Sequence, residues 1–317
     1  MLKSLGDEEF ENILKQISAR LNFKGLTIKD FKQIEDSVGG NNFVYYVNNS
    51  QKKFVLKIGL LENDYENFKN FEFISQNLSG KLYLPVPKVF VIGRFASLNG
   101  EVYPFMVEEF FDGSTLRYLN ENENEQLVQE VAKFAFKLHN DLKGEIFQRL
   151  KRRFYKRDWY LSLVEDVLKN IEILEEKNFL NKEKSLNLQE RYNEFFHIHR
   201  HIFINSRLCF LHGDLYSGNF IVNKEKTKVI VAIDWDFAKV GDPASEVALY
   251  PDFYLESYIN LCKNLKDFNE EDFRERVRLY QLILLPAVMI SLIKKGGKID
   301  LGKFFQKIDE RFAQILP

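Results

Sequence analysis

Hydrophobic residues recur at helical spacing in several stretches of the chain. This spacing places them on one face of a helix and predicts helices over residues 7–21, 62–78, 126–140 and 159–177. In the first stretch, the apolar positions are Phe10, Ile13, Leu14, Ile17 and Leu21. The chain is mainly helical after Gly113, and again from about residue 252 onward.

Short runs of β-branched and aromatic residues, bounded by turn signals, predict strands. The N-terminal strands are expected at 28–34, 43–47, 54–58, 89–95 and 101–110. The first three form an antiparallel meander, because Gly-Gly-Asn-Asn and Asn-Asn-Ser turns separate them. Later strands are expected at 208–211, 220–223 and 229–234. The sequence therefore predicts an α+β protein, with a β-rich unit over 1–111 and a helical unit over 112–317 that carries an embedded hairpin.

Charge and cysteine content narrow the function classes. The chain has 45 basic and 46 acidic residues and a net charge of −1, without the basic excess of a nucleic-acid binder. Cys209 and Cys262 are its two cysteines, so neither a disulfide framework nor zinc-ligand spacing is present. The most apolar stretch, 282–293, contains Pro286 and is too short to span a bilayer, which predicts a core helix. We expect a cytoplasmic protein without a secretory signal or membrane partner.

Polar residues cluster at the strand ends within residues 211–248. Asp214 follows an apolar strand, Asn219 comes five positions later, and Asp234 ends the next strand but one. We expect these three side chains to converge at one end of the hairpin. Phosphoryl transfer needs such a cluster, because one carboxylate orients the attacking hydroxyl while other oxygen ligands hold Mg²⁺.

The same stretch resembles a known superfamily. His-Gly-Asp at 212–214, Asn219 and the Ile-Asp-Trp-Asp that starts at Ile233 are similar to motifs of the aminoglycoside phosphotransferase and choline kinase superfamily, which has a bilobal protein-kinase-like fold. Gly-Asp-Pro at 241–243 fits too, although Glu246 stands where that superfamily usually has Asp. The resemblance implies a catalytic Asp214, magnesium ligands Asn219 and Asp234, and Asp236 as an accessory ligand. It also implies that His212 and Asp242 support the catalytic loop, with a helix N-cap as the alternative for Asp242.

The N-terminal half resembles the nucleotide site of the same superfamily. Gly39, Gly40 and Asn41 lie where a turn would cover the phosphates, because glycine allows close approach of backbone amides. Lys57 resembles the strand lysine that contacts the α- and β-phosphates. Glu72 and Glu66 are its candidate partners, and they point about 240° apart on a helix, so both cannot face it. The spacing of Glu72 to Pro87 favours Glu72.

The segment 104–113 resembles the hinge that holds the adenine. Backbone groups of Val107, Glu108 and Glu109 are expected to bond the base, and Met106 to line its slot, with an ordinary core methionine as the alternative. The implied reaction is transfer of the γ-phosphate of ATP, with GTP as an alternative, to a hydroxyl of a small molecule in the presence of Mg²⁺.

Other functions fit less well. A protein kinase would carry His-Arg-Asp and Ala-Pro-Glu segments, which this chain lacks. A metal-dependent hydrolase leaves the Lys57 and Gly-Gly signals unexplained, and an inactive kinase-like nucleotide-binding protein would not need all the catalytic residue types.

The acceptor is left open between an aminoglycoside, choline or ethanolamine, homoserine and a sugar amine, as is the choice between monomer and homodimer. An aminoglycoside would use acids, for which the candidates are 120–125, Asp252, Glu256, Glu270, Glu271 and Asp272. Choline would use aromatic rings, for which the candidates are Tyr250, Phe253, Tyr254 and Tyr258.

Overall fold

The computed structural model divides the chain into two compact units. Unit 1 comprises Met1–Glu130 and Tyr216–Phe237, and unit 2 comprises Val131–Leu215 and Ala238–Pro317. The boundary expected after residue 111 thus leaves out residues 112–130 and 216–237, which group with the N-terminal strands. The structure describes residues 7–21, 27–34, 42–48, 53–97, 100–116, 125–155, 157–294 and 300–315.

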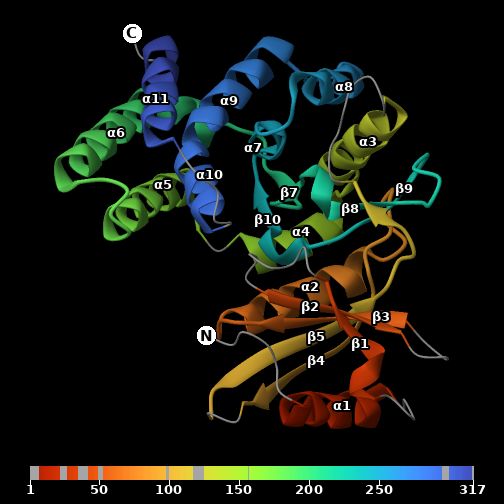
Figure 1. Cartoon of the computed structure of the whole chain (residues 1–317). Helices are drawn as coiled ribbons and strands as arrows, with labels where there is room; N and C mark the ends of the chain where they lie inside the picture. Colours follow the sequence, from red (N-terminus) through yellow and green to blue (C-terminus); the bar gives the residue numbers. More distant parts are fainter. Residues whose placement is uncertain are drawn as a thin grey trace. The chain divides into compact units, whose positions relative to one another are not determined.

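A five-stranded antiparallel sheet forms the centre of unit 1 (Figure 1). Its strands are β1 (Phe31–Gln33), β2 (Asn42–Asn48), β3 (Lys53–Gly59), β4 (Val89–Ala96) and β5 (Val102–Glu109). The strand order is β1-β2-β3-β5-β4, so the predicted meander is confirmed for the first three strands. Helix α2 (Asp64–Leu78) then connects β3 to the edge strand β4, and the next strand, β5, lies between β3 and β4.

The two faces of this sheet have different helices (Figure 1). One face packs Phe54, Leu56 and Ile58 of β3 and Phe105 and Val107 of β5 into the core under α1 (Asp7–Leu21). Because side chains alternate along a strand, Lys57 and Met106 point to the opposite face, which α2 covers. That face carries the candidate nucleotide residues.

The remaining strands of unit 1 form a small sheet with the order β6-β8-β9. It consists of β6 (Ser114–Thr115), β8 (Phe220–Val222) and β9 (Val229–Ala232). The Leu116 N–H donates to Phe220 O at 2.8 Å, and the Val229 N–H donates to a carboxylate oxygen of Glu130 at 2.6 Å. The predicted hairpin is therefore present, and these contacts attach it to the segment after β5.

Unit 2 is mostly helical, as predicted. Its helices are most of α3 (Glu125–Asp141), α4 (Gly144–Phe154), α5 (Trp159–Glu176), α6 (Lys182–Ile204), α7 (Pro243–Val247), α8 (Asp252–Cys262), α9 (Glu270–Ile283), α10 (Leu285–Lys294) and α11 (Leu301–Ile315). Unit 2 also contains a two-stranded antiparallel sheet of β7 (Cys209–Leu211) and β10 (Lys239–Gly241), against which α4 packs.

The single helix expected over 282–293 is interrupted in the structure, because α9 ends at Ile283 and α10 begins at Leu285. Pro286 has no N–H to donate to Leu282 O, four residues earlier. The buried Tyr192 hydroxyl donates to that carbonyl instead, at 2.9 Å. The apolar run is therefore two core helices joined at a proline break.

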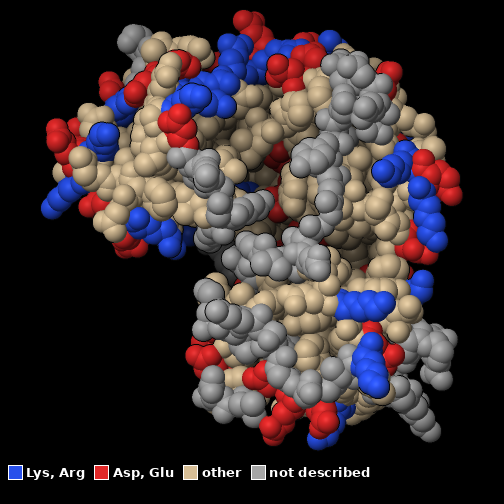
Figure 2. Space-filling view, viewed as in Figure 1, with Lys and Arg blue, Asp and Glu red and all other residues tan. Residues whose placement is uncertain are grey.

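Basic and acidic side chains are interspersed over the described surface in Figure 2. This pattern agrees with the near-zero net charge. Within the described part of the chain, no helix is by itself long and apolar enough to cross a membrane; the bent pair α9 and α10 meets that test only as a pair, by length and composition.

Candidate active site

The loop that carries Asp214 begins where β7 ends in unit 2. β7 is buried and pairs with β10, with Leu211 opposite Lys239, so the start of the loop is held by a sheet. His212 is fully buried, and Asp214 is half-buried. Gly213 has φ +85°, a conformation that strains residues with a Cβ, so the His-Gly-Asp sequence needs its glycine.

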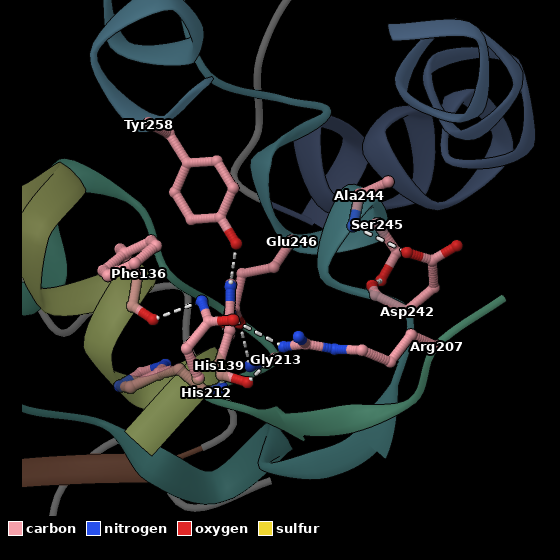
Figure 3. Close-up of polar contacts among 11 residues, drawn as sticks. Phe136, His139, Arg207, His212, Gly213, Asp242, Ala244, Ser245, Glu246 and Tyr258 are labelled. Carbon is pink, nitrogen blue, oxygen red and sulfur yellow. Dashed lines mark hydrogen bonds and ion pairs between the residues drawn. The ribbon is translucent and has the colours of Figure 1, made fainter. Parts of the chain in front are cut away.

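Glu246 of α7 anchors this loop by its backbone. Its carboxylate accepts from the Gly213 N–H at 2.5 Å and from the His212 N–H at 3.2 Å (Figure 3). The same carboxylate lies 2.8 Å from His139 Nε2, whose Nδ1 lies 2.7 Å from the Tyr258 hydroxyl. All these side chains are buried, and they join three helices of unit 2 to the loop that carries Asp214.

The charge of Glu246 follows from these contacts. Burial alone raises the pKa of this carboxyl, but the hydrogen bond and charge of His139, with His212 and the Gly213 N–H, lower it below its ordinary range. An ionised carboxylate only accepts hydrogen bonds, so His139 carries a proton on Nε2. Glu246, where the superfamily usually has Asp, thus retains a carboxylate in contact with the loop.

Asp242 caps the helix that carries Glu246. Its Oδ1 accepts from the Ala244 N–H at 2.9 Å, which is the N-cap geometry given as an alternative from the sequence. Arg276 Nε lies 3.5 Å from Asp242 Oδ2. Burial raises the pKa of Asp242, and the charge of Arg276 opposes that shift. Asp242 therefore orients α7, and through α7 it supports Glu246.

Asn219 and Asp234 lie at the same end of the β8–β9 hairpin in unit 1. Phe220 pairs with Ala232, and the Ile233 N–H donates to Asn219 O at 2.8 Å, so the register brings the two ends together. Asn219 is buried in a 3₁₀ turn, Ser217–Asn219, and Asp234 begins the turn after β9. Asp234 has φ +66°, a conformation that is uncommon for residues other than glycine, asparagine and aspartate.

Lys57 is buried beside this hairpin end. Its Nζ lies 3.1 Å from Asp234 Oδ1 and 3.5 Å from Glu108 Oε1. Burial alone lowers the pKa of Lys57, but the charges of Glu108 and Asp234 raise it above its ordinary value, so this lysine is a cation. Burial raises the pKa of Glu108 to about 7 against the opposing effect of Lys57.

The predicted pairing of Lys57 with Glu72 is wrong. Glu72 Oε2 lies 2.9 Å from the ammonium of Lys69, one turn earlier on the same helix. A helix places residues three apart side by side, so this local pair forms without any tertiary requirement. Glu108, which was predicted only for backbone contacts to the base, is the carboxylate that joins Asp234 at the lysine.

Asp236 extends the cluster toward β2. Its Oδ2 accepts from Asn42 Nδ2 at 3.1 Å, while its Oδ1 is buried without a hydrogen-bond partner. Burial raises the pKa of Asp236 to about 6, and Lys57 opposes this while Asp234 adds to it. Asn42 was not predicted as a site residue, although it is the last residue of the Gly-Gly-Asn-Asn turn signal at 39–42.

The donor set suits magnesium. Asn219, Asp234 and Asp236 offer the hard oxygen ligands that Mg²⁺ prefers, and an orphaned buried carboxylate oxygen is among them. Among the described residues, no group of three or more His, Cys, Asp and Glu side chains is arranged to hold a metal ion alone. An ion here would complete its shell with Asn219, water and substrate oxygens, as magnesium usually does.

The expected hinge residues lie inside strand β5, between β3 and β4. Met106 is buried opposite Lys57, and the Val107 side chain belongs to the core under α1. The Glu109 N–H donates to Lys88 O at 2.9 Å, so this donor is already used and does not suit the predicted contact with a base. Gly39, Gly40 and Asn41, the predicted phosphate-covering turn, lie outside the described residues.

Comparisons with known proteins identify the family and the fold of the chain. A profile described as "Phosphotransferase enzyme family" matches residues 33–279. A search of curated proteins found no match. Among solved structures, the GDP and kanamycin complex of APH(2")-IIia is 15% identical, with a TM-score of 0.68 over 95% of this chain and 98% of that chain.

A thermostable mutant of aminoglycoside phosphotransferase APH(4)-Ia, in ternary complex with ADP and hygromycin B, is also 15% identical, with a TM-score of 0.66 over 96% and 98% of the two chains. At this level of identity, the likeness establishes that the folds are the same.

Proposed function

Because the chain belongs to the phosphotransferase enzyme family, we propose that it transfers the γ-phosphate of ATP to a hydroxyl group of a small molecule, with Mg²⁺ as cofactor. The observation that carries this proposal is the cluster at the hairpin end, where Asp234 meets a buried, charged Lys57. The neighbours solved with ADP or GDP support a nucleotide donor and leave GTP as the alternative.

Each residue has a distinct role in this proposal. Asp214 orients the acceptor hydroxyl and accepts its proton, and Lys57 binds the phosphates of the nucleotide. Asn219 and Asp234 hold the metal, with Asp236 as accessory ligand, and the bound metal neutralises negative charge on the phosphates. Catalysis comes mainly from positioning and charge neutralisation, which rigid, buried contacts provide.

Three of the five candidate acids on α8 and α9 give little support to a polycationic acceptor, because they already pair with arginines. Glu256 and Glu270 both bind Arg274, at 2.6 and 2.8 Å, and Asp272 lies 3.4 Å from Arg276. These carboxylates are already neutralised by basic side chains of the same surface. The segment 120–124, also considered for this role, lies outside the described residues.

The tyrosines considered for a choline cage are packed against other rings. Tyr250 stacks on Tyr254 with centroids 3.7 Å apart, and Tyr258 stacks on Phe273 at 5.6 Å. A quaternary ammonium needs open ring faces. Core packing therefore accounts for these residues better than a cation site does.

The test is transfer of labelled phosphate from ATP, and from GTP, to a panel of hydroxyl compounds with Mg²⁺ present. The panel contains kanamycin, hygromycin B, choline, ethanolamine, homoserine and sugar amines. We expect turnover on a panel member that Asp214→Ala abolishes while Mg·ATP binding persists. A wild-type protein that binds neither Mg·ATP nor Mg·GTP in calorimetry would refute the proposal.

A further inference from the structure

The sheet register brings Glu108 to the strand lysine. β3 pairs antiparallel with β5, with Val55 opposite Glu108 and Lys57 opposite Met106. Lys57 and Glu108 are therefore diagonal neighbours on one face of the sheet, a separation that long side chains span. This is the face under α2, where Lys57 Nζ also lies 5.8 Å from the Phe71 ring centroid.

The burial of the Lys57–Glu108 pair lowers the stability of the protein. The side chains of Lys57 and Glu108 are 7% and 5% exposed, and Glu108 Oε2 is buried without a hydrogen-bond partner. A buried ion pair stabilises a protein less than well-packed apolar residues of similar volume do, and an unpaired oxygen weakens it further. The stability of the fold therefore does not explain why position 108 carries a glutamate and not an apolar residue.

We propose that Glu108 is the positioning residue that holds the Lys57 ammonium toward the phosphates of the bound nucleotide, the role that the sequence assigned to a glutamate of α2. The inference rests on the proposed function, because it deepens the role of Lys57 in that site. Its basis is the diagonal register, the 3.5 Å contact between Lys57 and Glu108, and the pairing of Glu72 with Lys69.

Asp234 does not replace Glu108 in this role. Its Oδ1 lies 3.1 Å from Lys57 Nζ, and its side chain is 37% exposed, so it faces both the lysine and the solvent side where a metal would bind. A carboxylate that coordinates a divalent cation interacts less strongly with the lysine ammonium. Without Glu108, Lys57 would pair with Asp234 alone and compete with the metal for it.

The experiment measures nucleotide and nucleoside affinity by calorimetry on the full chain. Mg·ATP, Mg·ADP and adenosine are titrated into the wild type and into Glu108→Gln and Glu108→Leu, with the guanine series used instead if the wild type prefers it. The Gln amide oxygen still accepts from Lys57, whereas Leu does not. We expect about tenfold weaker binding of both nucleotides in Glu108→Leu, which corresponds to one strong hydrogen bond lost. Glu108→Gln should lie between it and the wild type, and adenosine affinity should stay within twofold.

Two further variants separate this role from alternatives. Glu72→Gln tests the helix glutamate and should bind nucleotides like the wild type, and Glu62→Gln, on an exposed turn of the same unit, controls for the loss of a charge. The double variant Lys57→Met with Glu108→Leu replaces the pair by apolar residues and should fold, as judged by its thermal melting. Its nucleotide affinity should be no weaker than that of Lys57→Met alone, because Glu108 acts only through the lysine.

The outcomes separate the two proposals. A wild type that binds nucleotide, with Glu108→Leu binding it equally well, overturns the role of Glu108 and leaves the proposed function standing. Equal losses for adenosine and Mg·ATP in Glu108→Leu also overturn it, because the phosphate contact would then not be the cause. A wild type that binds no nucleotide overturns the proposed function and this inference together.

Discussion

Replacement of Glu246 by glutamine removes the charge of this side chain but keeps its shape, and so tests what the charge contributes. The carboxylate now accepts from the Gly213 N–H on Oε1 and from the His212 N–H and His139 Nε2 on Oε2. A glutamine side chain has one acceptor oxygen and an NH₂ group. If its oxygen takes the Oε2 position, the NH₂ group faces the Gly213 N–H, and two donors meet in a buried site.

The expected loss of stability follows from the hydrogen bonds that the glutamine cannot make. A hydrogen bond to a charged group contributes about 1.5–3 kcal/mol, and a buried N–H left unpaired costs about 1–3 kcal/mol. With partial relaxation we expect the free energy of unfolding of Glu246→Gln to fall by about 3–5 kcal/mol. Native proteins are stable by about 5–15 kcal/mol, so the variant should fold but be strongly destabilised.

The assays are urea denaturation and steady-state kinetics at pH 7. The midpoint should fall sharply for Glu246→Gln, and kcat should fall more than the affinity for Mg·ATP does, because the anchored loop carries Asp214. Glu172→Gln, on the exposed face of α5, is the matched control and should change the free energy of unfolding by less than about 0.5 kcal/mol. A Glu246→Gln midpoint equal to that of the control would refute the reasoning.

The pH dependence gives a second test of the same contacts. The groups that face Glu246 are His139, His212 and the Gly213 N–H, and together they lower its pKa in the folded state. A lowered folded pKa means that the contribution to stability is complete above the unfolded value of 4.5 and is lost as the pH falls through the folded value. The stability difference between wild type and Glu246→Gln should therefore shrink as the pH falls below 4.5. A difference that grows with acid would contradict the assignment.

Three other changes have clear expected outcomes. Asp214→Ala should reduce kcat at least a hundredfold, the lower bound for general-base catalysis, while Mg·ATP affinity in calorimetry stays within a few-fold. Asp234→Ala should weaken magnesium-dependent ATP binding by about tenfold or more in the same assay, and unchanged binding would contradict its role as a metal ligand. Gly213→Ala should lower stability by about 1–2 kcal/mol in urea denaturation, because alanine is strained at φ +85°, and a neutral effect would show that the loop relaxes.

The sequence predicted the elements whose signals are periodic or dense. The helix at Asp7–Leu21, strand β2 and strand β3, which carries Lys57, lie where expected, because amphipathic spacing and β-branched runs report local structure directly. Strands β6 and β10, which have two and three residues, were missed because such short runs carry no periodicity. The motif from 212 to 246 indicated the candidate site, because its polar residues occur at strand ends.

The spacing of residues along the sequence could not predict contacts between distant segments. His139 meets Glu246 across 107 residues, and its position in the last turn of an amphipathic helix gives no sign of a buried carboxylate partner. The partner of Lys57 was expected on the following helix, where Glu72 instead forms a local ion pair with Lys69. Glu108 could have been found only from the register of β3 against β5, which depends on the strand order of the whole sheet.

Glu246 and Glu108, whose contacts spacing did not predict, each contact another group of the chain, and in the proposed function neither touches the reactants. Glu246 accepts from backbone N–H groups of the loop that carries Asp214, and Glu108 contacts Lys57. Both lie in low-dielectric surroundings, where removal of either leaves buried donors uncompensated and costs stability of the same order. Their effects on function should nevertheless differ, since one holds the proposed base and the other the proposed phosphate contact. Loss of Glu246 should lower turnover with nucleotide affinity nearly kept, and loss of Glu108 should lower nucleotide affinity first. If both variants lost turnover and affinity in the same proportion, general destabilisation would explain them better than positioning does.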